Sequence, residues 1–416
     1  MNRFIIIIIF LTITGYFACH QSSVNHIETF LNKIPDDFDP IIKDPEKYRL
    51  QIIYTKIDRT DMNEPVLSTY SYRVNDLEYF YPASTVKMPV SFLALEKINE
   101  LDVPGLDKYT TMLTDSSYTG QSRVMVDTTS EIGLPSVGHY IRRIFLVSDN
   151  DAFNRLYEFV GQREINDNLS KKDFTGSRIT HRLSTPLSRD ENAHTNPVNF
   201  YIDDDLLYTQ PEIVNSITYR SKFRVFAGKK NMVNGVVENS PREFTYSNFI
   251  PLDELHDLLV SVIFPESLPE SGRFNLTDKD YRFLYQYMSQ YPSETSYPEY
   301  GDEYADNYVK FFLFGNHKGS LPENIRIFNK VGEAYGFLTD VAYIIDFENK
   351  IEFFLAATIY VNENEIVNDG VYDYDSIGIP FMHALGEVVY NYEMKRERKN
   401  APDLTKFMVN YDKAEH

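Results

Sequence analysis

A serine and a lysine one helical turn apart, Ser84 and Lys87, could form a nucleophile and its base. A serine hydroxyl attacks poorly unless a neighbouring group takes its proton, and residues at i and i+3 of a helix share one face. The positive end of the helix dipole disfavours a charged lysine there, and the backbone N–H groups at that end could stabilise an oxyanion. Taken alone, the pair is better explained as an N-cap serine beside a surface lysine.

Two further polar motifs follow along the chain. Ser148-Asp149-Asn150 separates two predicted helices, and Lys330-Val331-Gly332 ends a predicted strand. The first motif can be explained structurally as helix capping. The second can be explained as the end of a strand at a glycine turn or bulge.

In this order and on these elements, the three motifs resemble the S-x-x-K, S-D-N and K-T-G motifs of the penicillin-recognising serine enzymes, most closely the class A β-lactamase-like serine hydrolases. The flanking residues strengthen the resemblance, at 82–89 (PASTVKMP), 148–161 (SDNDAFNRLYEFVG) and 330–342 (KVGEAYGFLTDVA). It covers about residues 48–395.

The resemblance implies a role for each residue of the acylation step. Ser84 would be acylated by a β-lactam carbonyl or by a peptide ending in D-alanine, with Lys87 as its base or a proton relay. Ser148 would pass a proton to the leaving nitrogen, and Lys330 would attract the substrate carboxylate and assist the relay.

The same resemblance assigns the substrate-binding residues. Asn150 would hold the amide side chain of the substrate, and Gly332 and Glu333 would line the site. The backbone N–H groups of Ser84 and Glu333 would form the oxyanion hole.

Two departures from the family pattern concern binding and deacylation. Val331 replaces the threonine that contacts the substrate carboxylate, so recognition would depend on Lys330 or another group. The run Thr180-His181-Arg182-Leu183 resembles the one that precedes the family's deacylating glutamate, but residues 184–188 contain no carboxylate. Glu191 is the nearest glutamate, and a surface loop acid is its preferred interpretation.

A mixed fold must position these motifs. Strands are expected within Tyr48–Asp58 and at Ile325–Gly332, Gly336–Phe347 and Ile351–Val361. Helices are expected from Ser84 to Leu101, where Pro89 has no local explanation, and at Pro135–Val147, Asp151–Val160, Leu252–Phe264, Thr277–Tyr287 and Pro380–Lys395. The fold class is α/β (α+β) and β-lactamase/DD-peptidase-like, with an antiparallel sheet flanked by helices and an inserted all-helical unit.

The expected units follow from this pattern. Residues 46–100 and 320–400 would form the α/β unit, and residues 101–319 the helical unit, with a poorly periodic insertion around 198–249 and an acidic, tyrosine-rich surface loop at 293–308. Residues 401–416 would be a C-terminal tail. A cleft between the two units would hold the ligand.

The amino terminus has the layout of an export signal. A short positive start precedes the apolar run Phe4–Ala18, which is typical of a signal peptide at residues 1–18. The only cysteine, Cys19, follows it and resembles the acylated residue of a bacterial lipoprotein, although an ordinary signal peptide is the alternative. Residues 19–45 would be a tether and helix, and the protein would be periplasmic or a cell-envelope lipoprotein.

Composition excludes several other classes. The 416 residues carry a net charge of −20, and their 31 Tyr and 29 Phe are far more than a disordered chain contains. The one basic stretch, Ser221–Lys230, is better read as a surface loop than as a nucleic-acid site. The 9 His show no H-x-H or H-E-x-x-H spacing, and the acidic cluster Asp369, Asp373 and Asp375 is interpreted as a solvated turn, so neither a metal nor an organic cofactor is expected.

Three functions stay open. The leading one is a β-lactamase that works through an acyl-serine intermediate on a small-molecule substrate, with membrane contact only through a lipid anchor. The second is a D-alanyl-D-alanine peptidase or transferase acting on cell-wall peptides, and the third is a non-catalytic binding protein on the same fold.

Overall fold

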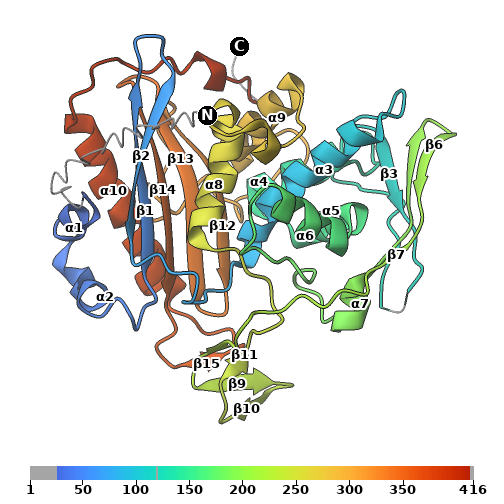
Figure 1. The fold of residues 1–416 in the computed structure, drawn as a ribbon, viewed down its shortest axis with the longest axis horizontal. Coiled ribbons are helices and arrows are strands. Elements are labelled where there is room, and N and C mark those ends of the chain that lie inside the picture. Colours follow the sequence, from blue (N-terminus) through green and yellow to red (C-terminus); the bar gives the residue numbers. More distant parts are fainter. Residues whose placement is uncertain (1–25, 119, 413–416) are drawn as a thin grey trace, which may run out of the picture.

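The centre of the molecule is a five-stranded antiparallel sheet (Figure 1). A computed structural model describes residues 26–118 and 120–412. The sheet order is β12 (Ile325–Ala334), β13 (Phe337–Asp346), β14 (Ile351–Tyr360), β1 (Gln51–Arg59) and β2 (Pro65–Tyr72). Segments from both ends of the chain therefore form one sheet, and β12 is one of its edges.

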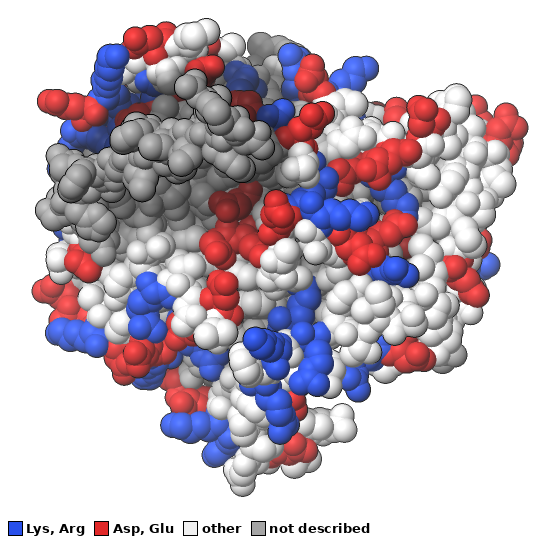
Figure 2. All heavy atoms as spheres, viewed as in Figure 1, with Lys and Arg blue, Asp and Glu red and all other residues white. Residues whose placement is uncertain are grey.

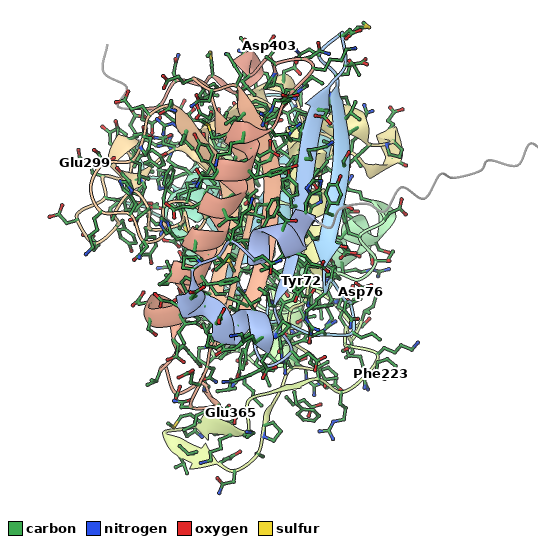
Figure 3. The ribbon with its side chains drawn as sticks, turned by 90° about the vertical axis from the view of Figure 1, so that its left-hand side faces the viewer. Tyr72, Asp76, Phe223, Glu299, Glu365 and Asp403 are labelled. Carbon is green, nitrogen blue, oxygen red and sulfur yellow. The ribbon has the colours of Figure 1, made fainter. Side chains whose placement is uncertain are left out.

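Helices cover both faces of this sheet. On one face lie α10 (Ile379–Lys395), α1 (His26–Leu31) and α2 (Asp39–Lys43), in front of the strands in Figure 3. On the other lie α8 (Leu252–Ile263) and α9 (Asp278–Ser289). Every residue of β13 and β14 is buried because both faces are covered. This arrangement confirms the expected antiparallel sheet flanked by helices.

A group of four helices packs beside edge strand β12: α3 (Lys87–Leu101), α4 (Val137–Val147), α5 (Asn150–Val160) and α6 (Gln162–Lys171). α3 is apolar on nearly all sides, as a helix surrounded by protein must be, and it contacts α4, α5 and α6.

The start of α3 differs from the sequence prediction. The α-helix begins at Lys87, whereas Ser84 lies in a short 3-10 helix, η2 (Ala83–Val86). Ser84 therefore does not open the α-helix. The later start explains Pro89, because an N–H in the first turn has no partner within an α-helix and a proline there loses nothing.

The inserted segment also differs from the expected all-helical unit. β3 (Thr111–Thr114), β5 (Val198–Ile202) and β6 (Asp205–Gln210) form a second sheet. These strands are short and partly exposed, so they leave no clear alternation in the sequence. The remaining α-helix and strands of the described chain are α7 (Arg189–Ala193), β4 (His194–Thr195), β7 (Ile213–Val214), β8 (Phe226–Ala227), β9 (Lys230–Val233), β10 (Val236–Glu238), β11 (Arg242–Glu243) and β15 (Ile366–Val367).

Charged groups of both signs are interspersed over the face in Figure 2. The basic stretch Ser221–Lys230 is largely exposed, and Arg224 within it pairs with Glu243. In residues 26–118 and 120–412, no helix is long and apolar enough to cross a membrane, and no group of three or more His, Cys, Asp or Glu could hold a metal ion. Cys19 and the expected signal peptide lie outside the described residues.

Candidate active site

Ser84 and Lys87 touch as their spacing predicts. Lys87 Nζ donates a 2.8 Å hydrogen bond to Ser84 Oγ, and the lysine is completely buried. Ala83, just before the serine, has a φ of 47°, in the left-handed region that residues with a Cβ rarely adopt. Such strain persists only where the surrounding structure enforces it, and it clusters at functional sites.

The S-D-N motif meets the same lysine from the junction of two helices. Ser148 ends α4 with a left-handed φ of 58°, and α5 begins at Asn150. Lys87 Nζ lies 3.2 Å from Ser148 Oγ and 2.7 Å from Asn150 Oδ1, and it also donates to the carbonyl of Ser148. Asp149 makes none of these contacts, since it caps α5 and pairs with Arg143.

Lys330 reaches Ser148 from the edge strand β12. Its Nζ donates to Ser148 Oγ at 2.8 Å and to the carbonyl of Val331 at 2.9 Å, and the residue is 2% exposed. Ser148 Oγ is thus within hydrogen-bond distance of two lysine nitrogens, those of Lys87 and Lys330.

Gly332 lets β12 approach the nucleophile. A Cβ built on Gly332 would lie 2.4 Å from the carbonyl oxygen of Pro82 and 3.2 Å from the backbone nitrogen of Ser84. Only a residue without a side chain permits this approach. Glu333 follows directly, so the two expected oxyanion donors belong to backbone segments that touch.

Burial changes the protonation of both lysines. Desolvation, and then the positive charge of Lys330, lowers the pKa of Lys87 well below its usual value, while Asp149 raises it. Desolvation lowers the pKa of Lys330 to about 7, against a favourable interaction with Asp340. A neutral Lys87 next to a serine hydroxyl is chemically able to accept its proton.

Glu191 does not join this cluster. It is the N3 residue of a capping box that opens α7, where its carboxylate accepts the N–H of Ser188 at 2.6 Å. In the described chain, no carboxylate makes a hydrogen bond with Ser84, Lys87 or Lys330.

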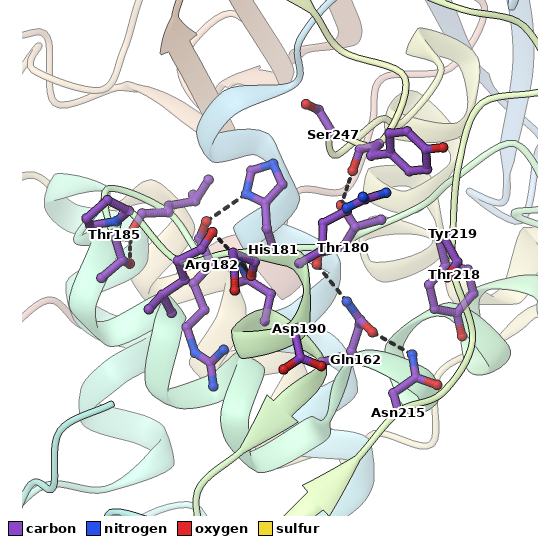
Figure 4. Close-up of a pocket in the computed structure, with 18 of the residues that line it drawn as sticks. Gln162, Thr180, His181, Arg182, Thr185, Asp190, Asn215, Thr218, Tyr219 and Ser247 are labelled. Atoms are coloured by element: carbon purple, nitrogen blue, oxygen red, sulfur yellow. Dashed lines mark hydrogen bonds between the residues drawn. The ribbon is translucent and has the colours of Figure 1, made fainter. Parts of the chain in front are cut away.

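Two cavities adjoin the cluster, one at Ser184 and the other at Ser148. The larger cavity has a volume of about 1220 Å³ and meets the site at Ser184, whose Oγ accepts a 2.8 Å hydrogen bond from Asn150. In Figure 4 the chain from Thr180 to Arg182 runs along it. Its lining includes Tyr81, His181, Ser184, Arg189, Arg242 and Tyr335.

The smaller cavity has a volume of about 350 Å³. Ser148 and Val331 lie in its wall, so it borders the proposed proton relay directly. The side chains of Glu333 and Asp375 also line it, and both are exposed.

Sequence reasoning missed several residues that border the cluster. Ser184 follows the Thr-His-Arg-Leu run and could have been noted as the polar residue where an acid was sought. Tyr308 and Asp375 were placed in surface segments, and nothing local to either residue indicates that the chain folds back to the site.

The chain was compared with known proteins. Residues 58–213 match the model of the beta-lactamase enzyme family. This range contains Ser84, Lys87 and the Ser148 motif, and it confirms the resemblance to the penicillin-recognising serine enzymes. No curated protein matches the chain.

Several solved structures are similar to the chain at low sequence identity, including the following three. A beta-lactamase from Sphaerobacter thermophilus has 11% identity and a TM-score of 0.46, with 88% of this chain and 97% of that one covered. The enzyme from Streptomyces albus G has 12% identity and a TM-score of 0.46, with 85% and 99% covered. The protein PBP-A has 14% identity and a TM-score of 0.47, with 83% and 91% covered.

Proposed function

We propose that this chain, with its beta-lactamase-family match over residues 58–213, is a serine hydrolase that forms an acyl intermediate on Ser84 and opens β-lactam rings. One observation carries the proposal: the amine of a completely buried lysine, Lys87, lies 2.8 Å from the hydroxyl of Ser84, and its pKa is lowered by burial.

In the proposed acylation, Ser84 Oγ attacks the substrate carbonyl as Lys87 Nζ takes the hydroxyl proton. The C–O bond forms, and the carbonyl oxygen becomes an oxyanion facing the N–H groups of Ser84 and Glu333. The C–N bond then breaks, and the proton passes from Lys87 through Ser148 to the leaving nitrogen. Lys330, hydrogen-bonded to the hydroxyl of Ser148, keeps that relay oriented.

Hydrolysis requires a base that activates water, and among the described residues no carboxylate makes a hydrogen bond with Ser84 or Lys87. Glu191 is engaged in its capping box, and Ser184 stands beside Asn150 instead. This observation favours a second candidate, a D-alanyl-D-alanine peptidase or transferase whose acyl-enzyme is long-lived or passes to an amine.

Intact-protein mass after mixing the purified chain with a penicillin separates these functions. A transient adduct with drug consumption is expected of a β-lactamase, and a persistent adduct of the second candidate. Ser84→Ala should abolish the adduct, whereas the exposed control Ser293→Ala should retain it. A folded wild-type protein that forms no adduct would refute both enzymes and leave a non-catalytic binding protein.

We also propose that the protein is exported and anchored through a lipid on Cys19. The apolar run before the only cysteine supports this. Cys19→Ser should release the protein from the membrane fraction, and an unchanged distribution would contradict the anchor.

A further inference from the structure

The wall of the smaller cavity is acidic and would repel the carboxylate of a substrate. Val331 presents no hydroxyl there, and Glu333 and Asp375 add two acidic side chains. Of the described residues that line this cavity, none is a lysine, an arginine or a histidine.

The two acids have no partner that would cancel their charge. Within residues 26–118 and 120–412, the carboxylates of Glu333 and Asp375 make no side-chain hydrogen bond and no ion pair, although the backbone of Glu333 pairs with β13. Desolvation in the cleft, followed by repulsion from Asp375, raises the pKa of Glu333 to about 7. Two neighbouring acids without a cation in the same wall make the cavity electronegative.

Lys330 is not available to neutralise these two acids. The residue is 2% exposed, and its amine is already hydrogen-bonded to Ser148 Oγ and to the carbonyl of Val331. A substrate carboxylate placed against Val331 would therefore lie near the buried Lys330 and would be repelled by Glu333 and Asp375.

The cavity lies on the leaving-group side of the scissile bond, because Ser148 in its wall is the proposed donor to the leaving nitrogen. Asn150, which the family resemblance assigns to the acyl side chain, donates a hydrogen bond to Ser184 in the wall of the larger cavity, and this puts that cavity on the acyl side. This orientation rests on the proposed function.

We propose that Glu333 and Asp375 are specificity-determining residues that select substrates with a neutral or cationic leaving-group side, such as a primary amide or an amine, and select against a carboxylate. Like-charge juxtaposition rejects the acid, and opposite charge attracts the amine. The substrate class is then an amide or a β-lactam without a free carboxylate beside the leaving nitrogen.

The test compares three penicillins with one acyl side chain, namely the free acid, its carboxamide and its aminoethyl amide. The rate of Ser84 adduct formation is measured for each by intact mass. The carboxamide and the aminoethyl amide should each react at least tenfold faster than the acid.

A charge-neutralised variant tests the residues. In Glu333→Gln/Asp375→Asn the ratio of acid to aminoethyl amide rates should rise at least tenfold, and the backbone N–H at 333 is retained. Asp302→Asn/Glu303→Gln removes the same charge from exposed residues outside the cavity and should leave the ratio unchanged.

The outcomes distinguish this inference from the function on which it rests. Adducts that form fastest with the free acid would overturn the selectivity and leave the acyl-serine function standing. No adduct with any of the three probes would overturn both. If the double variant does not fold, the rates of the wild-type protein with the three penicillins still test the proposed selectivity.

Discussion

Replacing Gly332 with alanine should slow acylation of Ser84 by about 10- to 100-fold. The added Cβ would lie 2.4 Å from the carbonyl oxygen of Pro82 and 3.0 Å from Thr85 Cγ2. Real Cβ atoms essentially never approach closer than 3.0 Å, so β12 and the Ser84 turn must separate by about 0.6 Å.

The magnitude follows from that displacement. A misplacement of about 1 Å between reacting groups can cost about 100-fold in rate, so about 0.6 Å corresponds to about 1.4–2.7 kcal/mol of activation free energy. Overpacking should also lower the free energy of unfolding by about 1–3 kcal/mol.

The assay is the rate of Ser84 labelling by a fluorescent penicillin, with the melting temperature measured on the same sample. Gly272→Ala is the matched control, because no atom lies within 4 Å of a Cβ built there. If Gly332→Ala keeps both labelling rate and melting temperature, the close approach of β12 to Ser84 is wrong. If only the melting temperature falls, β12 is packed as described but does not set the geometry of attack.

Three further predictions concern buried charge. Burial and the charge of Lys330 lower the pKa of Lys87, so acylation should slow on acidification as Lys87 takes a proton. A rate that stays constant over the whole acidic range in which the protein is folded would exclude Lys87 as the base. Burial lowers the pKa of His139 from 6.5 to about 4. On acidification the unfolded chain therefore binds a proton at His139 before the folded protein does. The free energy of unfolding should fall by about 3 kcal/mol as the pH drops from 6.5 to about 4. His139→Gln should flatten this limb in urea titrations, and an unchanged slope would assign it to other groups. Glu393 is buried and pairs with both Arg396 and Arg398. Glu393→Gln should therefore lower the free energy of unfolding by about 3–5 kcal/mol. A denaturant midpoint equal to that of the wild type would show that the guanidinium groups find other partners.

The sheet and the main helices could be predicted because their periodicity is strong. β13 and β14 are buried on both faces and are rich in β-branched and aromatic residues, and the bounds of α4 and α5 lie within two residues of those expected. The second sheet could not be predicted. β6, for example, has only one buried residue and lacks the alternation that marks a half-buried strand.

The candidate catalytic cluster was predictable from motifs, but its surroundings were not. Ser84 and Lys87 are neighbours by helical geometry alone, which the 3-10 turn preserves at the same spacing. Asp375 reaches the site only because the chain after β14 folds back over β12. No local pattern encodes that path, and its acidic neighbours favour a solvated turn instead.

The two lysines around Ser148 are not equivalent, and strand pairing is the reason. Two ammonium groups within 3.2 Å of one hydroxyl in a buried site cannot both remain protonated. Asp340 lies opposite Val331 in the sheet and favours the charged form of Lys330, whereas the nearest acid to Lys87, Asp149, is neutralised by Arg143. This asymmetry favours the neutral form at Lys87 over that at Lys330, which supports the proposed roles of Lys87 as the base and Lys330 as the cation. In this proposal, the register of β12 on β13 distinguishes two residues that have the same side chain.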